Sequence, residues 1–445
     1  MIEQLKTLLT APDLPERLHT LAGNAPASTP VSLCLQLGKQ NHDWLQLLPA
    51  SGQFWYQSQP AKEIFRLGIG HALQITSAGP HRFSALDNAY QGFCQHWQHN
   101  GRALAFSGFA FDETSDTSLP NALLSIPAIL LENIGGYCTV TLTTPAARMP
   151  QAISDWQQQL TPAPNTPTGK IIAAPATMLA DRAWVARVNA ALRDIQLGTV
   201  SKLVLSRQRR IESTQPFSPR HLLDQLIQQQ PNSLIYAYGT RQQYFLGATP
   251  ERLVQLNNQK IHADALAGTA WAGSAELAGE KNCHEQSLVV DAVRTALLPF
   301  CTQLPEVSPV QTHSAGHLLH LRSEISAMAK PGTRLFDLVR ALHPTPAVGG
   351  YPSVAALDWL RAHKEQRPSW YSGALGWLDP MGNGEFSVAL RSALIDGKLA
   401  LLQAGAGIVA GSQPEQELAE TEAKIGTLLA ALQTAPGTIK NGTHS

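Results

Sequence analysis

Val200-Ser-Lys-Leu-Val-Leu-Ser206 is an apolar, β-branched stretch that predicts a buried β-strand. The two-residue period of a strand places Lys202 on the same side as Val200 and Val204. A lysine in such a strand is usually a solvated residue at a sheet edge. If the strand is central instead, the ammonium is desolvated and the amine becomes available as a general base. The residues of the stretch leave both interpretations open.

The segments on either side of this stretch predict a mixed α/β chain. Asp181 can cap a helix that ends at Gly198, immediately before the strand. In the first 160 residues, short apolar runs alternate with turn residues, which predicts strands at 31–37, 103–111, 123–131 and 137–142. Further helices are expected at about 282–298, 353–363 and 415–433, and further strands at about 233–238, 244–247, 371–378, 385–395 and 398–403.

Four parts are expected along the chain. Residues 1–160 form a strand-rich N-terminal part, and the proline-rich segment 161–180 forms a loop or linker, because prolines remove hydrogen-bond donors and favour extended neighbours. Residues 181–435 hold the candidate catalytic residues, and residues 436–445 form a polar tail. No short internal repeat is present, which excludes a solenoid.

The composition of the chain favours a small-molecule partner. Among 445 residues, 44% are hydrophobic and 15% charged, as in an ordinary globular protein. The 33 lysines and arginines balance 33 acidic residues, so no net positive field would attract nucleic acid or an anionic membrane. Five scattered cysteines without a Cys-x-x-Cys pair are expected to be reduced thiols. Because the start carries no signal-peptide pattern, we expect a cytoplasmic protein.

Three glutamates stand out in two predicted helices. Glu285 lies at helical spacing from apolar residues, on the side of its helix that should face the core. A buried carboxylate needs a cation, a hydrogen bond or a raised pKa, so a metal or a basic partner is a reasonable expectation. Glu417 and Glu420 lie three residues apart on one helix face. A solvated face with an ion pair from Glu420 to Lys424 is the simpler explanation of that second pattern.

Three further positions have both a structural and a functional interpretation. Arg391 shares a predicted strand face with Ser387 and Ala389, which is either exposed or a rigid mount for a guanidinium that binds a carboxylate. Gly405-Ala-Gly407 is usually a turn, although glycines also let backbone N–H groups approach an anion. His343 lies in a loop rich in proline and glycine, where a structural role is the simplest explanation. No serine-nucleophile elbow or Walker loop supports a hydrolase or nucleotide-binding protein.

Taken together, these segments resemble the chorismate-utilising enzymes, the family of isochorismate, salicylate, anthranilate and aminodeoxychorismate synthases. The resemblance runs in family order from about Trp184 to Leu432. It implies a single large α/β (α+β) chorismate-binding fold, with two stacked antiparallel β-sheets flanked by helices, to which the first 160 residues contribute strands. The motifs that carry it are Lys202-Leu-Val-Leu-Ser-Arg207, Gly247-Ala-Thr-Pro-Glu-Arg-Leu253, Ala265-Leu-Ala-Gly-Thr269, Glu280-Lys-Asn-Cys-His-Glu285, the His343 loop, Tyr371-Ser-Gly373, Ala389-Leu-Arg391, Ala404-Gly-Ala-Gly-Ile408 and Glu415-Gln-Glu-Leu-Ala-Glu420.

The resemblance implies a Mg²⁺-dependent enzyme whose substrate is chorismate. The ion would be held by Glu285 and Glu420, with Glu417 nearby, and would bind the ring carboxylate of the substrate; ligation by oxygen atoms suits magnesium. The enolpyruvyl carboxylate would be held by a second set of residues, so that a flexible dianion is fixed in one pose before reaction. That second set comprises Arg391, Tyr371 and the backbone around Gly405 and Gly407, with His343 and Thr269 lining the same pocket.

Position 202 separates the members of the family by nucleophile. Ammonia-using members characteristically carry glutamine there, so Lys202 implies a water-using member. Lys202 would take a proton as water attacks ring carbon 2, and Glu251 would protonate the hydroxyl that leaves carbon 4. Ala267 stands where aminodeoxychorismate synthases often carry a nucleophilic lysine, and Leu266 matches the residue that helps to place the water in isochorismate synthases.

These features favour an isochorismate synthase. A salicylate synthase, which makes isochorismate and then eliminates pyruvate, is the nearest alternative, and the large subunit of an anthranilate synthase is less favoured. A catalytically inactive homologue that acts as a binding protein is the alternative from a different class. The resemblance leaves open whether the product serves menaquinone or siderophore synthesis, and it leaves the oligomeric state open.

Overall fold

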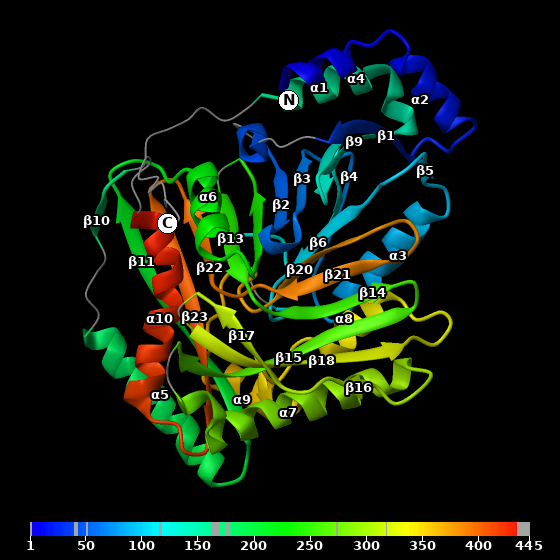
Figure 1. Cartoon of the computed structure of the whole chain (residues 1–445). Coiled ribbons are helices and arrows are strands. Elements are labelled where there is room, and N and C mark those ends of the chain that lie inside the picture. Colours follow the sequence, from blue (N-terminus) through cyan, green and yellow to red (C-terminus); the bar gives the residue numbers. More distant parts are fainter. Residues whose placement is uncertain are drawn as a thin grey trace, which may run out of the picture.

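The strands form two large β-sheets that stack face to face, with helices on their outer faces (Figure 1). The computed structural model describes residues 2–39, 43–49, 52–114, 118–161, 169–173, 178–241, 243–272, 275–316 and 318–433. Both sheets combine strands from the first 160 residues with strands from the C-terminal half. The N-terminal part is therefore built into the same body as the rest of the chain.

The larger sheet has 13 strands in the described part of the chain, and neighbours are antiparallel except for β1 and β5. Its strands in spatial order are β10 (Ile171–Ala173), β11 (Lys202–Ser213), β23 (Leu399–Val409), β22 (Ser392–Asp396), β13 (Gln243–Thr249), β12 (Leu234–Gly239), β2 (Phe54–Gln59), β3 (Ile64–Ile69), β8 (Ile129–Ile134), β9 (Tyr137–Pro145), β1 (Pro30–Lys39) and β5 (Gln98–His99); β19 (Gly350–Tyr351) also pairs with β11.

The smaller sheet has 10 strands within the described ranges, all paired in antiparallel fashion. Its strands in spatial order are β16 (Glu306–Val307), β18 (Leu318–Met328), β15 (Lys260–Trp271), β14 (Arg252–Asn257), β21 (Gly384–Val388), β20 (Ala374–Leu378), β6 (Ala105–Phe109), β7 (Ala122–Ile126) and β4 (Leu73–Ser77); β17 (Gln311–Ala315) also pairs with β18.

Helices cover the outer faces of both sheets (Figure 1). The larger sheet packs against α1 (Ile2–Leu9), α2 (Leu14–Ala22), α4 (Ala152–Gln159), α6 (Pro219–Gln229), α5 (Met178–Gln196), α9 (Ser353–Ala362) and α10 (Pro414–Gln433). The smaller sheet packs against α3 (Arg82–Cys94), α7 (Glu280–Leu297) and α8 (Leu335–Leu342). Short 3₁₀ helices span Trp44–Leu47, Pro60–Lys62, Ala146–Gln151, Ala275–Ala278 and Leu298–Phe300. None of the described helices is both long and apolar enough to cross a bilayer.

Strand β2 shows why the sheets stack in this way. Phe54 and Tyr56 join the core under the outer helices, whereas Trp55 between them joins a second core that lies between the two sheets. Successive side chains of a strand point to opposite faces, so a strand that is apolar on both sides must be covered on both. In the inner core, Trp55 stacks on Phe106 of the opposite sheet, with 5.4 Å between ring centroids.

The chain crosses from one sheet to the other at two adjacent places. Strand β13 of the larger sheet ends at Thr249 and β14 of the smaller sheet begins at Arg252, with Glu251 between them. Strand β21 of the smaller sheet ends at Val388 and β22 of the larger sheet begins at Ser392, with Arg391 between them. Because β13 pairs with β22 and β14 with β21, the two crossings lie side by side.

The predicted fold of two stacked antiparallel sheets with flanking helices is confirmed. Two predicted strands are wrong in detail, because 385–395 is divided into β21 and β22, and 123–131 into β7 and β8. The structure also differs at 161–180, where β10 and the start of α5 lie in the segment expected to be a loop or linker. Residues 162–168, 174–177 and the expected tail 436–445 lie outside the described residues.

A buried ion pair within the larger sheet holds an arginine against the smaller sheet and yields a stability prediction. Glu132 of β8, 1% exposed, accepts a hydrogen bond from Arg66 Nε at 3.0 Å, and the guanidinium of Arg66 lies 4.4 Å from the ring centroid of Trp377 in the other sheet. Glu132→Ala leaves Arg66 buried without an anion, so we expect the free energy of unfolding to fall by about 3–5 kcal/mol in urea denaturation. Lys6→Ala breaks only an exposed pair and should change it little; equal losses in both variants would contradict the prediction.

Candidate active site

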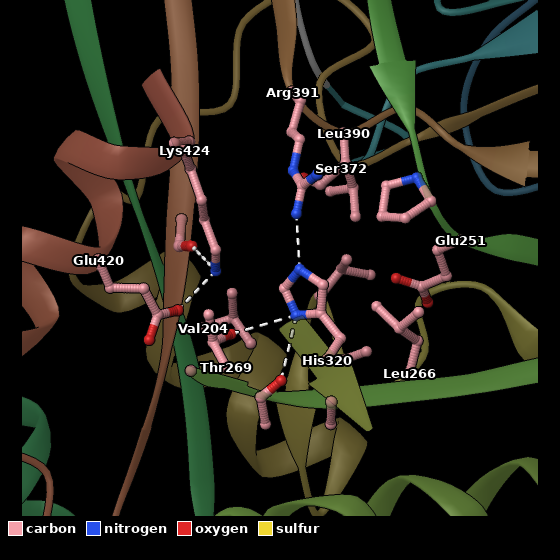
Figure 2. Close-up of a pocket in the computed structure, with 18 of the residues that line it drawn as sticks. Val204, Glu251, Leu266, Thr269, His320, Ser372, Leu390, Arg391, Glu420 and Lys424 are labelled. Carbon is pink, nitrogen blue, oxygen red and sulfur yellow. Dashed lines mark hydrogen bonds and ion pairs between the residues drawn. The ribbon is translucent and has the colours of Figure 1, made fainter. Parts of the chain in front are cut away.

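A cavity lies beside the two crossings and is lined by residues from both sheets and from two of the covering helices. Glu251 and Arg391 reach it from the crossings, Glu285 reaches it from α7, and Glu420 and Lys424 reach it from α10. In Figure 2, Lys424 and Arg391 project toward the centre of the cavity, and Glu251 lies on the opposite side from Lys424. The cavity therefore brings together ionisable side chains that lie up to 173 positions apart in the sequence, from Glu251 to Lys424.

Glu251 is held as a buried carboxyl. Its side chain is only 2% exposed, and Oε1 has no hydrogen-bond partner among the described residues. Burial, reinforced by the nearby carboxylate of Asp264, raises the pKa of Glu251 to about 8. At neutral pH this residue therefore carries a proton that it can donate into the cavity, as a general acid must.

Lys202 lies in the interior of the larger sheet. It is the first residue of β11, which pairs with both β23 and β19 at this position, and its side chain is 1% exposed. The solvated-edge interpretation of Lys202 is therefore wrong. Its Nζ lies 2.8 Å from Glu285 Oε1. Burial raises the pKa of Glu285, but the neighbouring lysine ammonium groups, that of Lys202 foremost, together lower it by more, so the pKa of Glu285 lies below its ordinary value.

Two glycines of β23 allow these side chains to approach the cavity. A methyl group on Gly407 would lie 2.5 Å from Glu285 Oε1 and 3.0 Å from Lys202 Cε. A methyl group on Gly405 would lie 2.8 Å from the hydroxyl of Tyr371. The Gly-x-Gly sequence lies within strand β23 rather than in a turn, and it leaves room for functional side chains.

Each of the three predicted metal-ligating glutamates is paired with a lysine. Besides the pair of Lys202 with Glu285, Lys424 Nζ lies 2.6 Å from Glu420 Oε1, and Lys281 Nζ lies 2.6 Å from Glu417 Oε1. Glu417 is 1% exposed and lies behind the cavity wall rather than on it. Within the described ranges, no three His, Cys, Asp or Glu side chains converge closely enough to hold a metal ion.

Arg391 carries a positive charge that no carboxylate neutralises. It is 4% exposed, and its backbone has a φ of 47°, a left-handed conformation that is uncommon for arginine. Its Nη1 donates to the carbonyl of Ala315 at 3.1 Å, and its Nη2 lies 2.6 Å from His320 Nε2. No ion pair of Arg391 occurs in the described part of the chain. Burial lowers the pKa of Arg391 to about 10, so the group stays protonated at neutral pH.

The remaining predicted site residues divide into two groups. Tyr371, Leu266 and Thr269 line the cavity together with Gly405 and Gly407. His343 does not reach the cavity wall, although we expected it there. Its Nε2 is hydrogen-bonded to the carbonyl of Ser372 at 3.0 Å, and burial lowers its pKa to about 3, so it supports the wall from behind as a neutral group.

Three polar residues of the cavity were not recognised from the sequence. Arg367 donates to the carbonyls of Val348 and Val204, and His320 bridges Arg391 to β15. Lys424 donates to the carbonyl of Gly405 and lines the cavity, although the sequence suggested only a solvated pair with Glu420. The sequence feature that could have identified His320 is a lone histidine among the leucines at the start of β18.

Such a fold and such a cavity define an α/β protein with an enclosed site lined by both acidic and basic side chains. A family model described as chorismate binding enzyme matches residues 22–433, and the chain therefore belongs to the chorismate-binding enzymes. The resemblance inferred from the sequence is thus confirmed.

Similar proteins cover nearly the whole chain. The chain is 33% identical to the salicylate biosynthesis isochorismate synthase of Pseudomonas aeruginosa, over 86% of this chain and 85% of that protein. It is 27% identical to isochorismate synthase MenF of Bacillus subtilis, over 86% and 88% respectively. The solved structure of MenF, the menaquinone-specific isochorismate synthase from Escherichia coli, has a TM-score of 0.78 at 25% identity, over 94% of this chain and 99% of that one.

The raised pKa of Glu251 predicts how stability depends on pH. The ordinary pKa is 4.5 and the folded value is about 8, so between these values the folded state binds a proton that the unfolded state has lost. Folding stability attributable to this group therefore falls as pH rises through that range. Glu251→Gln should unfold at a higher temperature than the unsubstituted protein at pH 9 but not at pH 4.5, measured by thermal melting. The exposed control Glu16→Gln should show no such pH dependence, and a Glu251→Gln effect equal at both pH values would refute the prediction.

Proposed function

We propose that this chain is an isochorismate synthase, which adds water to ring carbon 2 of chorismate as the hydroxyl at carbon 4 leaves. The observation that carries the proposal is a buried protonated carboxyl, Glu251, on the wall of a cavity where a second wall residue, Glu285, is paired with the buried Lys202 directly behind it. Proteins named isochorismate synthase match the chain over most of its length. All the assigned residues lie between 202 and 424, within the region 181–435 that we propose as catalytic.

The two groups divide the proton transfers of the isomerisation. A water molecule loses a proton to Lys202 as its oxygen bonds to carbon 2, and the ring double bonds shift as the carbon 4 to oxygen bond breaks. Glu251 donates its proton to the departing hydroxyl, which leaves as water. Lys202 then releases a proton to solvent and Glu251 regains one, so the reaction consumes no net proton.

A dianionic substrate fits the cations of the cavity. Arg391 and Arg367 are buried without a carboxylate partner in the described chain, so their charges are available to a carboxylate of the substrate. A guanidinium can hold a carboxylate through two parallel hydrogen bonds, which fixes its orientation. We assign the enolpyruvyl carboxylate to Arg391 with the hydroxyl of Tyr371, which lies next to Gly405.

The carboxylates near Lys202 fit Mg²⁺ as the cofactor. Glu285 and Glu420 both reach the cavity, and Mg²⁺ typically takes one or two carboxylates and completes its shell with water and substrate oxygens. Each carboxylate is already neutralised by a lysine, which shows that these positions stabilise a positive charge. The ion would supply the charge that binds the ring carboxylate. With Glu285 engaged by the ion, Lys202 would lose the carboxylate that favours its ammonium form, and its neutral amine would be the base.

The nucleophile is indicated by two apolar residues of the cavity wall. Leu266 and Ala267 are apolar positions on the cavity wall, so the cavity contains no additional amine at position 267 that could attack the ring. We therefore propose water as the nucleophile, with chorismate and no nucleic acid as the partner.

We propose a cytoplasmic location because none of the five cysteines forms a disulfide.

Product analysis tests this function directly. Purified protein with chorismate and Mg²⁺ should yield isochorismate, resolved by chromatography from salicylate plus pyruvate. Lys202→Ala and Glu251→Gln should each lower kcat by about 10²–10⁴-fold, because each removes one proton transfer, while thermal melting shows a folded protein. Salicylate as the main product would replace the proposal by a salicylate synthase, and anthranilate formed only with ammonia would remove the role of water. Unchanged kcat in Lys202→Ala would refute the base assignment.

Lys281 provides a test of the metal site that does not depend on turnover. Its ammonium lies 2.6 Å from Glu417 and raises the positive charge around all three glutamates. Lys281→Met should therefore tighten Mg²⁺ binding by about ten-fold, equivalent to ~1.4 kcal/mol, in calorimetric titration without chorismate. The control Lys6→Met removes a lysine from an exposed pair at the N-terminus and should leave Mg²⁺ affinity unchanged. Equal or weaker Mg²⁺ binding by Lys281→Met would contradict the assignment.

A further inference from the structure

His320 connects the backbone of β15 to the guanidinium of Arg391 (Figure 2). It lies in β18, is 4% exposed and lines the cavity. Its Nδ1 lies 3.1 Å from the carbonyl oxygen of Gly268 and 3.3 Å from Thr269 Oγ1, while its Nε2 lies 2.6 Å from Arg391 Nη2. Each ring nitrogen therefore has one partner with a fixed hydrogen-bonding role, the carbonyl of Gly268 at Nδ1 and the guanidinium of Arg391 at Nε2.

These partners permit a single tautomer of the imidazole. The guanidinium of Arg391 can only donate, so Nε2 of His320 must accept and cannot carry a proton. The carbonyl of Gly268 can only accept, so Nδ1 must carry the proton and donate it. Burial and the neighbouring Arg391 hold the pKa of His320 well below its ordinary value, which keeps the ring neutral.

A β-bulge aims the carbonyl of Gly268 at the histidine. The register between β15 and β18 shifts between Ala267 and Thr269, and Gly268 has a φ of 67°, a conformation that glycine adopts without strain. Bulges of this kind redirect groups near functional sites. The bulge therefore fixes the ring of His320, and the ring in turn fixes Arg391.

A neutral partner has a consequence that a carboxylate would not have. An aspartate or glutamate at this position would also orient Arg391, but it would neutralise the charge that a substrate carboxylate needs. The imidazole and the carbonyl of Ala315 hold the guanidinium through Nη2 and Nη1 and leave its net charge in place. The arrangement therefore combines a fixed orientation with an unneutralised positive charge.

We propose that His320 is a positioning residue that holds Arg391 in the orientation for binding the enolpyruvyl carboxylate and does so without neutralising its charge. The inference deepens the proposed function and rests on it, because it takes Arg391 to bind a carboxylate of chorismate. It adds a second residue to the carboxylate site and assigns that residue a defined protonation state.

Two substitutions separate the two hydrogen bonds of the imidazole. His320→Gln places an amide near the position of Nε2, so that its oxygen can accept from Arg391. His320→Asn places an amide near Nδ1, where it can donate to Gly268 but does not reach Arg391. Because a hydrogen bond to a charged group contributes about 1.5–3 kcal/mol, His320→Asn should raise the KM for chorismate by about ten- to hundred-fold with a smaller change in kcat. His320→Gln should stay within about three-fold of the unsubstituted protein, an estimate from the same hydrogen-bond range.

The outcomes separate a positioning role from a purely structural one. Equal effects of the two variants, a larger effect of His320→Gln, or no effect of either would overturn the proposal. In an Arg391→Ala background, His320→Asn should cause no further rise in KM, since its partner is gone, and an additive rise would likewise contradict it.

Nitrogen-15 NMR of the imidazole tests the same inference without turnover. The His320 signals, assigned by their loss in His320→Gln, should show a protonated Nδ1 and an unprotonated Nε2 from pH 6 to 8. A proton on Nε2 would refute the inference even if the protein makes isochorismate. Failure of the unsubstituted protein to convert chorismate would refute the proposed function, and the NMR result would still decide the tautomer of His320.

Discussion

The site depends on one constraint of the fold. The chain passes from one sheet to the other at two places, between β13 and β14 and between β21 and β22, and these two crossings lie side by side. The N–H of Val388 donates to the carbonyl of Glu251 at 3.1 Å, and the N–H of Ala248 donates to the carbonyl of Arg391 at 3.3 Å. These backbone bonds tie the two crossings together. The acid and the main cation are thus fixed relative to each other by main-chain geometry, as a preorganised site requires. If either residue were carried by a separate loop, the distance between Glu251 and Arg391 would depend on side-chain packing alone.

The left-handed backbone of Arg391 is a local cost of this arrangement. Non-glycine residues with positive φ are uncommon, and such strained positions persist when the surrounding structure determines them. Two features determine the conformation of Arg391. The strands on either side of it pair in different sheets, β21 with β14 and β22 with β13, and its guanidinium is hydrogen-bonded to Ala315 and His320. Backbone and side chain therefore restrain the same residue from two directions.

Most of the candidate residues named from the sequence line the cavity, whereas the change of sheet that places them there was not predicted. The motifs that carry the resemblance contain Lys202, Glu251 and Glu285, because each motif is a short stretch that can be recognised in the linear sequence. The break at Arg391 was invisible, since apolar residues continue on both sides and no glycine or proline marks the change of sheet. His320 and Arg367 were missed for a related reason: each has a partner more than 50 positions away, Gly268 for His320 and Val204 for Arg367, which only the folded chain brings close.

The positive charges at the two ends of the cavity have different partners, and under the proposed function this difference would orient a dianionic substrate. Near Lys202, Glu285, Glu417 and Glu420 are each paired with a lysine, and under the proposed function a metal ion would take over the positive charge at this end. Near Arg391, the guanidinium is held by a carbonyl and a neutral imidazole, so its charge is permanent and its direction is fixed. Under the proposed function, a substrate carboxylate at the first end would bind together with a metal ion, whereas one at the second end would meet a site that is complete beforehand. Since the two carboxylates of chorismate differ in their distance from ring carbon 2, this asymmetry would select the proposed pose, in which that carbon faces Lys202.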